Sequence, residues 1–362
     1  MNKHIFIVES FTATTHTFIR EDVLRHDSSN IIDISKIEIQ KIRDFGISQL
    51  YILKRIIKII LCNPLDIAKL LFSIRFLQNA KALYLWSRID EIHNLGPGDL
   101  LSCHFVAKCA VIGFLARCQT GCQLRIICHA SDLYTLPRGM NIILQNATIL
   151  EPVTWFAKGF IFGRIGSAAL GKAIMRRNGV AEMAAPKDEI NNTLVPSATL
   201  RLLTACRLVN QKDIHFAIMV VNQLKASGFS VLFEVIGSGP LYASLVRDVE
   251  GLNLNNEVTF VGERDNDYVR QAMRRSDAFL LPCEELNLDH ADGLPVVFQE
   301  ALSEGCPIFC RRAFGVAELI INGINGWAFE GSDDEAVWAK VISSQVKGFD
   351  RALIRNVANH QR

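Results

Sequence analysis

The stretch from Asp292 to Glu318 contains two carboxylates eight positions apart, Asp292 and Glu300, followed by an apolar run. It begins Asp292-Gly-Leu-Pro-Val-Val-Phe-Gln-Glu300-Ala-Leu-Ser-Glu-Gly305 and continues through Cys306-Pro-Ile-Phe-Cys310 to Phe314-Gly-Val-Ala-Glu318. Gly293 and Pro295 predict a turn after the first carboxylate. The second carboxylate, Glu300, is predicted to open a short helix that Gly305 ends, with an apolar strand after it.

This alternation of turn, helix and strand suits a particular ligand. A turn that feeds a helix N-terminus presents backbone N–H groups and the positive end of the helix dipole, both of which favour a phosphate. Ionised carboxylates only accept hydrogen bonds, so Asp292 and Glu300 suit the hydroxyls of a sugar or ribose. Together these features indicate a pocket for a nucleotide-sugar.

The stretch resembles the signature of family 4 retaining glycosyltransferases of the GT-B fold, in which an acidic residue, seven others and Glu-Ala precede a Gly-x-x-Glu turn. The run Ala291-Asp-Gly-Leu-Pro-Val-Val is similar to the branch that makes colanic acid and other exopolysaccharides. The motifs are most specific over Leu200–Phe329. Asp292 stands where the family usually has Glu, and it is one methylene shorter.

The second half of the chain alternates predicted strands and helices, which indicates a doubly wound parallel α/β sheet. The predicted helices include Ile214–Ser227, Tyr268–Ser276 and the tail from Asp334. The predicted strands are Arg201–Ala205, Val231–Ile236, Glu257–Val261, Ala278–Pro282, Pro307–Cys310 and Gly326–Phe329.

The resemblance implies two Rossmann-like domains that face a cleft. We expect an N-terminal acceptor-binding domain at 1–186 and, because Pro186–Pro196 is polar and unpatterned, a linker at 187–198. A nucleotide-sugar-binding domain would follow at 199–345. In GT-B proteins a C-terminal helix, here 346–362, can cross back onto the first domain.

Arg207 and Lys212 follow the first strand of the second domain, at the spacing of the family's Arg-Leu-x-x-x-Lys-Gly motif, with Asp213 in place of the Gly. Two fixed cations would stabilise the negative charge that gathers on a diphosphate leaving group. The alternative is an ordinary solvated, charged turn.

Other donor-site residues are also implied by the resemblance. Glu300 would hold the ribose and Asp292 the sugar hydroxyls. The backbone of Gly293, Leu294, Pro295 and Val296 would support the sugar and phosphates. Gly237 and Gly239 end a strand, where they allow a backbone to approach a nucleotide, although a tight turn explains them equally well.

Asp265-Asn-Asp267 matches the Asp-x-Asp metal motif of another glycosyltransferase fold. We instead interpret it as a helix N-cap with an acid in the first turn. We therefore expect no metal and no cofactor.

In the first half, strands are predicted at His4–Val8, Asn30–Ile34, Asp99–Cys103, Leu124–Cys128 and Asn141–Ala147. Leu150–Met175 is predicted to be rich in helix. His104 and His129 follow neighbouring strands, at the edge where open α/β sheets bind ligands. His129-Ala-Ser-Asp132 resembles the family's His-Gly-x-Asp motif, whose His lies beside the transferred sugar. His104 is as consistent with a core histidine as with a site residue.

Composition sets further bounds. The 362 residues suit two domains, 49% are hydrophobic and the net charge is +2, so nothing indicates a nucleic-acid partner. Ten cysteines on apolar stretches predict buried thiols in a reducing compartment, hence a cytoplasmic protein. No run is predicted to cross a membrane, and the apolar run after Met1 is too short for a signal peptide.

A basic amphipathic stretch that includes Lys54, Arg55 and Lys58 predicts peripheral contact with an anionic membrane. A core helix with a solvated basic face is the alternative.

The predicted function is transfer of a sugar from a nucleotide-sugar to a saccharide or lipid-linked saccharide. By resemblance the anomeric configuration is retained, and the leaving phosphate oxygen acts as the base. A catalytically silent sugar-nucleotide-binding or scaffold subunit is the alternative, suggested by Asp292, Ala130 and Asp213.

Overall fold

The computed structural model divides by its contacts into two compact units, Met1–Gly179 and Val180–Arg362. The part of the chain that it describes comprises residues 3–8, 19, 22–23, 31–33, 57–61, 64–65, 76–87, 89–106, 108–129, 131–136, 141–176, 199–283, 294–312, 314–331 and 333–361. The predicted linker at 187–198 lies outside these residues.

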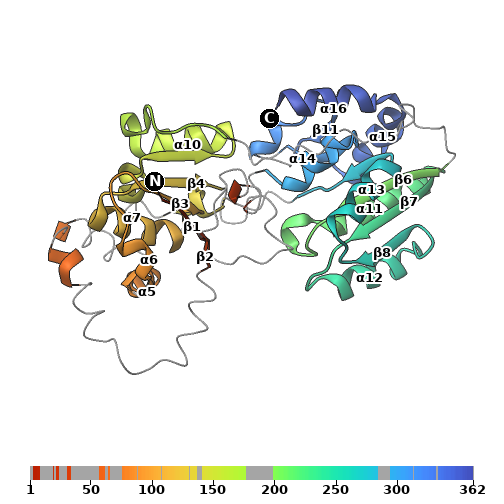
Figure 1. Ribbon diagram of the computed structural model, residues 1–362. Coiled ribbons are helices and arrows are strands. Elements are labelled where there is room, and N and C mark those ends of the chain that lie inside the picture. Colours follow the sequence, from red (N-terminus) through yellow and green to blue (C-terminus); the bar gives the residue numbers. More distant parts are fainter. Residues whose placement is uncertain are drawn as a thin grey trace. The chain divides into compact units, whose positions relative to one another are not determined.

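The first unit is built on a five-stranded parallel sheet of order β2-β1-β3-β4-β5. Its strands are β1 (His4–Val8), β2 (Ile31–Asp33), β3 (Leu100–His104), β4 (Gln123–Cys128) and β5 (Ile149–Pro152). Its helices are α5 (Phe76–Ser87), α6 (Asp90–His93), α7 (Lys108–Thr120), α8 (Ser131–Tyr134), α9 (Asn141–Asn146) and α10 (Trp155–Ile165), and the 3-10 helix η2 (Gly166–Ala169) follows. Figure 1 shows these elements in the red-to-yellow part of the chain.

The two faces of this sheet differ in chemistry because successive strand residues point to opposite sides. Helix α7 packs on the apolar face, where a Cβ at Gly113 would lie 2.6 Å from Leu124 Cδ1 and 2.7 Å from Cys103 Sγ. The opposite face carries Ser102 and Arg125, which are partners in the parallel register of β3 and β4.

The second unit is built on a six-stranded parallel sheet of order β11-β10-β9-β6-β7-β8. Its strands are β6 (Thr199–Ala205), β7 (Ser230–Ile236), β8 (Val258–Gly262), β9 (Ala278–Leu280), β10 (Ile308–Arg311) and β11 (Gly326–Phe329). Its α-helices are α11 (Ile214–Ala226), α12 (Tyr242–Gly251), α13 (Asn266–Arg275), α14 (Val296–Ser303), α15 (Glu335–Gln345) and α16 (Arg351–His360). The 3-10 helices are η3 (Asn210–Lys212), η4 (Phe314–Glu318) and η5 (Val346–Gly348).

The helices of the second unit pack in two groups around an apolar core. Helix α11 contacts α12 and α15, whereas α14 contacts α13 and the last helix, α16 (Figure 1). Buried Glu304, at the end of α14, joins the second group: Arg274 Nε lies 2.6 Å from its Oε2, and Arg270 pairs with its Oε1. Helix α16 is thus held to the second unit by its packing on α14.

The structure confirms the predicted GT-B class, with two parallel-sheet α/β domains. It corrects the strand that was predicted at Asn141–Ala147, because α9 occupies residues 141–146 and the strand is β5, at 149–152. The short apolar run Ile142-Ile143-Leu144 is buried in the helix, and periodicity alone cannot separate a short buried helix from a buried strand.

A second correction concerns Glu300, which does not open its helix. Helix α14 begins at Val296, directly after Pro295, so Glu300 lies one turn inside it. Proline favours this boundary because its fixed φ suits the start of a helix. The expected end is confirmed, since Gly305 has φ +74° just after the helix.

Candidate functional site

The cationic turn after β6 lies at the switch point of the second sheet. The chain runs outward from β6 to β7 and β8 and then returns to place β9 on the other side of β6. Ligands of open α/β sheets bind at the carboxyl ends of strands where the order reverses in this way. Arg207 and Lys212 both follow β6 here, and the Lys212 carbonyl accepts a hydrogen bond from Cys283 N, just beyond β9, at 3.4 Å.

The glycines after β7 hold this turn in place. Cys206 N donates to Ile236 O at 3.0 Å, and Leu208 N donates to Ser238 O at 2.8 Å, on either side of Arg207. A Cβ on Gly237 would lie 1.9 Å from Cys206 O, and one on Gly239 would lie 2.4 Å from Leu208 O. Both glycines are therefore required by the close approach of two backbone segments.

Arg207 is exposed on this turn, and within the described residues it makes no ion pair. The turn thus offers a cation to solvent at the edge of the sheet where a ligand is expected.

Asp213 keeps the backbone of the turn although it replaces the family's Gly. Its φ of 49° and ψ of 50° are left-handed, a conformation that Asp adopts more readily than most residues other than Gly. The carboxylate caps α11 by accepting from Phe216 N at 3.3 Å, and it pairs with Arg311 Nη1 at 2.6 Å. The substitution therefore preserves the turn and adds a cap.

Only part of the predicted acidic pair can be located. Asp292 and Gly293 lie outside the described residues, while Leu294, Pro295 and Val296 form the entry to α14. Glu300 is half-buried, and its Oε1 accepts a hydrogen bond from Asn266 Nδ2 at 3.1 Å. The structure thus places Glu300 next to the first residue of α13.

The interpretation of Asp265 as a helix cap is confirmed. Its Oδ1 accepts from Tyr268 N at 2.8 Å, and Asp267 lies in the first turn of α13. Nowhere in the described parts of the chain do three His, Cys, Asp or Glu side chains gather as metal ligands would.

In the first unit, the two predicted histidines lie together. His104 ends β3 and His129 follows β4, and both are buried. His104 Nδ1 is 3.4 Å from His129 Nε2, and the two rings are stacked with centroids 5.7 Å apart. The structure therefore places His104 beside the candidate catalytic residue His129 and not in a separate part of the core.

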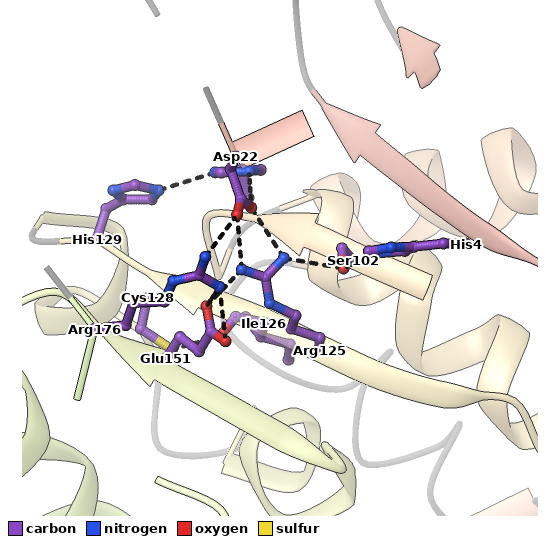
Figure 2. A network of polar contacts seen from close by, with 10 residues as sticks. His4, Asp22, Ser102, Arg125, Ile126, Cys128, His129, Glu151 and Arg176 are labelled. Atoms are coloured by element: carbon purple, nitrogen blue, oxygen red, sulfur yellow. Dashed lines mark hydrogen bonds and ion pairs between the residues drawn. The ribbon is translucent and has the colours of Figure 1, made fainter. Parts of the chain in front are cut away.

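A charged cluster that no sequence pattern predicted lies beside His104 (Figure 2). Arg125 donates to both oxygens of Asp22, at 2.9 and 3.0 Å, and to Glu151 Oε2 at 2.6 Å. Arg176 lies 3.4 Å from the same Glu151 oxygen and 3.7 Å from Asp22 Oδ1. An arginine inside the otherwise apolar strand Leu124–Cys128 was the signal that could have revealed the cluster.

Asp22 connects the cluster to the histidines, because its Oδ2 lies 3.2 Å from His104 Nε2. Burial by itself raises the pKa of the Asp22 carboxyl, but the bonds from His104 and Arg125 outweigh it and hold that pKa well below its usual range. Burial also lowers the pKa of His104, although the nearby Asp22 opposes that change. The favoured state is an ionised Asp22 beside a neutral His104.

The two units thus present different chemistry at the carboxyl ends of their strands. The second offers cations and a helix entry, which suit a diphosphate. The first offers a pair of buried histidines, one of which lies beside the half-buried carboxylate of Asp22. Among the described helices, none is both long and apolar enough to cross a membrane.

Residues 187–348 match the family described as Glycosyl transferases group 1. The chain is 29% identical over 146 residues to the putative colanic acid biosynthesis glycosyltransferase WcaL of Salmonella typhimurium, which covers 40% of this chain and 36% of that protein. It is 30% identical over 143 residues to the amylovoran biosynthesis glycosyltransferase AmsK of Erwinia amylovora, with 40% and 35% covered. The chain thus spans about a third of the length of these relatives.

Solved structures share the fold across nearly the whole chain. Anabaena HepE in complex with UDP and glucose has a TM-score of 0.64 at 16% identity, covering 100% of this chain and 95% of that one. The lipopolysaccharide outer core galactosyltransferase WaaB has a TM-score of 0.62 at 17% identity, covering 99% and 95%.

Proposed function

We propose that this chain is a glycosyltransferase that moves a sugar from a nucleotide-diphospho-sugar to a saccharide or lipid-linked saccharide and retains the anomeric configuration. We place it in the synthesis of exopolysaccharide, capsule or lipopolysaccharide. The second unit would bind the donor, and the first would bind the acceptor.

The observation that carries this proposal is the cationic turn at the switch point of the second sheet. Gly237 and Gly239 fix a backbone from which Arg207 extends, and this turn lies within the segment that matches the glycosyltransferase family. Fixed cations stabilise a departing diphosphate without rearranging during the reaction. The similarity to exopolysaccharide enzymes supports the proposed pathway class.

Within this proposal, Arg207 and Lys212 hold the diphosphate and Glu300 holds the ribose. Asp292 holds the hydroxyls of the transferred sugar, which His129 also contacts. The leaving phosphate oxygen takes the proton from the acceptor hydroxyl. No metal or cofactor takes part.

Donor binding tests the role of Glu300. Glu300→Gln should weaken nucleoside diphosphate binding by about 1.5–3 kcal/mol, the usual contribution of hydrogen bonds to a charged group. Calorimetry with a panel of nucleoside diphosphates measures this loss. Glu330→Gln is a matched control, because Glu330 is an exposed carboxylate that follows β11. Unchanged affinity in Glu300→Gln would remove the ribose assignment.

Turnover of radiolabelled nucleotide-sugars separates the enzyme from a silent binding or scaffold subunit. Asp292→Asn should lower turnover by about 10–100-fold, equivalent to about 1.4–2.7 kcal/mol, while leaving nucleoside diphosphate affinity nearly unchanged. Turnover should survive EDTA, and product NMR should show the anomeric configuration of the donor. Binding without turnover of any donor would favour the silent subunit, and loss in EDTA that manganese restores would revive a metal mechanism.

We also propose that the protein is cytoplasmic and that it contacts the inner face of the cell membrane peripherally. Lys54 and Arg55 lie outside the described residues, but Lys58 is exposed beside Leu61, which is 73% exposed. Basic side chains next to exposed apolar ones suit an anionic lipid surface. Replacing Lys54, Arg55 and Lys58 by Glu should abolish sedimentation with anionic vesicles. Equal sedimentation of both proteins would favour the core-helix alternative.

A further inference from the structure

Helix α10 is apolar on two opposite faces. One face packs into the first unit, where Ala157, Ile161 and Ile165 are buried as a single helical stripe. A surface helix usually carries polar residues on its other face. Here that face carries Trp155, which is 56% exposed, and Phe156, which is 39% exposed. The buried stripe serves the core, so the exposed aromatic side chains need another explanation.

Two glycines lie on the same exposed face. Gly159 and Gly163 are exposed, and a Cβ on either would meet nothing within 4 Å. At about 3.6 residues per turn, both lie between Trp155 and Phe156 around the helix. Glycine inside a helix lowers its stability relative to alanine, and no neighbouring atom requires it at these two positions. What glycine does permit is a close approach of the helix backbone to another surface. These four residues form the aromatic face of α10.

The charge of this segment has one sign. The chain has no acidic residue between Glu151 and Glu182. Five basic residues lie in the same stretch: Lys158, Arg164, Lys172, Arg176 and Arg177. The Nζ of Lys158 lies 4.9 Å from the centroid of the Trp155 ring, and none of the carboxylates in the described ranges pairs with it. A cation beside an exposed aromatic ring, in a stretch without acids, is complementary to an anionic lipid surface.

The same features favour a bilayer as the partner. Tryptophan is enriched at the boundary between lipid headgroups and acyl chains, because its ring is apolar and its N–H is polar. Helices that lie in this boundary combine large apolar side chains on one face with basic residues beside them. With 11 residues, α10 is too short to cross a bilayer, so it would lie along the surface.

We propose that α10 is a membrane-docking helix, whose aromatic face enters the headgroup region of an anionic bilayer and whose Lys158 meets the lipid phosphates. The aromatic rings would displace water from the lipid boundary, and the two glycines would let the backbone lie close to it. This surface is separate from the basic stretch at residues 54–58. A lipid-linked acceptor, which rests on the proposed function, would then meet the first unit at the bilayer.

A charge swap at Gly159 tests the proposal. Gly159→Glu and Gly159→Lys each place a long side chain in open space, and both residues favour a helix over glycine, so both variants should fold. Glu places a carboxylate among lipid phosphates and acyl chains. It should lower partitioning onto vesicles of phosphatidylcholine with phosphatidylglycerol at least about 10-fold. Lys can extend to the phosphates, so it should keep partitioning within about 3-fold of the wild type or raise it.

Gly251→Glu is the matched control for net charge. Gly251 ends α12 in the second unit, is exposed and also has open space around it. This variant changes the net charge by the same amount as Gly159→Glu, and its partitioning should equal that of the wild type.

Fluorescence of Trp155 measures whether the aromatic face itself enters the lipid. Trp155 is the most exposed of the four tryptophans. Its emission should move to shorter wavelength on anionic vesicles and should be quenched by lipids that are brominated near the headgroup. Trp155→Phe keeps an aromatic side chain, so it should still partition but lose the wavelength shift.

Equal partitioning of Gly159→Glu and Gly251→Glu overturns the proposal, and so does unshifted Trp155 emission in protein that sediments with vesicles. A wild-type dimer that Gly159→Glu dissociates in light scattering would assign the aromatic face to a second copy of the chain, and would overturn it too. None of these measurements requires turnover, so they are decided separately from the transferase activity. The contact proposed for residues 54–58 is tested by its own variant.

Discussion

The two parallel sheets differ in where they bury charge. In the first unit, buried Arg125 and Glu151 belong to neighbouring strands and His104 ends a third, so charge lies on the sheet itself. In the described part of the second unit, the buried charged side chains Arg270, Glu304 and Arg351 lie in helices or at a helix end. The strands there bury almost only apolar groups.

This difference indicates that buried charge has a different role in each unit. Replacing a buried ion pair by apolar side chains is often neutral or stabilising, so a charged cluster on a sheet face needs another explanation than stability. In the first unit that cluster lies against His104, which in turn contacts His129. In the second unit Glu304 joins the end of α14 to α13 and α16, and Arg207 and Lys212 lie on a turn after β6.

The largest expected effect comes from removing the centre of each charge cluster. Arg125→Ala removes the guanidinium that binds both Asp22 and Glu151, and Glu304→Ala removes the carboxylate that binds Arg270 and Arg274. Each should lower the free energy of unfolding by about 3–5 kcal/mol, whereas Lys225→Ala, which breaks a surface pair with Glu257, should cost less than about 1 kcal/mol. Urea denaturation measures these values.

Hydrogen exchange shows where each change acts. Arg125→Ala should increase exchange in β3 and β4, and Glu304→Ala should increase it in α13, α14 and α16. Turnover per folded molecule should fall sharply only for Arg125→Ala. A similar loss of turnover in Glu304→Ala would contradict the different roles that we assign to buried charge in the two units.

The next largest effect is expected from acid, which should lower the stability of the first unit. The pKa of His104 is lowered by its burial, so the unfolded chain takes up a proton near pH 6.5 that the folded chain resists. Stability should therefore fall as the pH drops below about 6.5, by at most about 1.4 kcal/mol per pH unit for this one proton. Asp22, whose pKa is also depressed, adds a further loss below about pH 4. The slope between pH 6.5 and 4 should be smaller in His104→Gln; an identical slope would exclude His104 as its source.

A smaller effect is expected from changing Gly237, which packs against the turn after β6. Gly237→Ala places a side chain at φ +127°, which costs about 1–3 kcal/mol, and pushes against Cys206 O. Gly228→Ala is the matched control, because Gly228 has φ +85° and open space around it. Both should lose stability, but only Gly237→Ala should weaken nucleoside diphosphate binding in calorimetry. Equal affinities would mean that the turn does not hold the donor.

The smallest effect is expected from Asp213→Gly. Glycine suits the left-handed backbone and costs only a few tenths of a kcal/mol as a helix cap, so the loss of the pair with Arg311 should bring the total to about 1 kcal/mol. Thermal unfolding and turnover both measure the outcome. A loss of turnover above 10-fold would show that Asp213 has a role of its own at the site.

Local sequence signals predicted almost all of the strand positions in the second unit. Each predicted strand there was found within about two residues, because strands buried on both faces appear as short apolar runs bounded by turns. Arg207 and Lys212 were predicted from the spacing of the family's Arg-Leu-x-x-x-Lys-Gly motif, and Gly237 and Gly239 from their position at the end of a strand. The helix start at Val296 was misplaced because Pro295 was interpreted as part of the turn alone.

Only the tertiary structure showed the cluster around Arg125. Asp22, Arg125, Glu151 and Arg176 are far apart in the chain, and each by itself is an ordinary charged residue. Arg125 and Glu151 meet because parallel strands align Ser102 with Arg125, and Ile127 with Glu151, on one face of the sheet. Asp22 and Arg176 reach the cluster from outside the strands. Sequence alone placed His104 and His129 at neighbouring strand ends; only the folded structure showed that the rings contact each other and that the carboxylate of Asp22 lies beside His104.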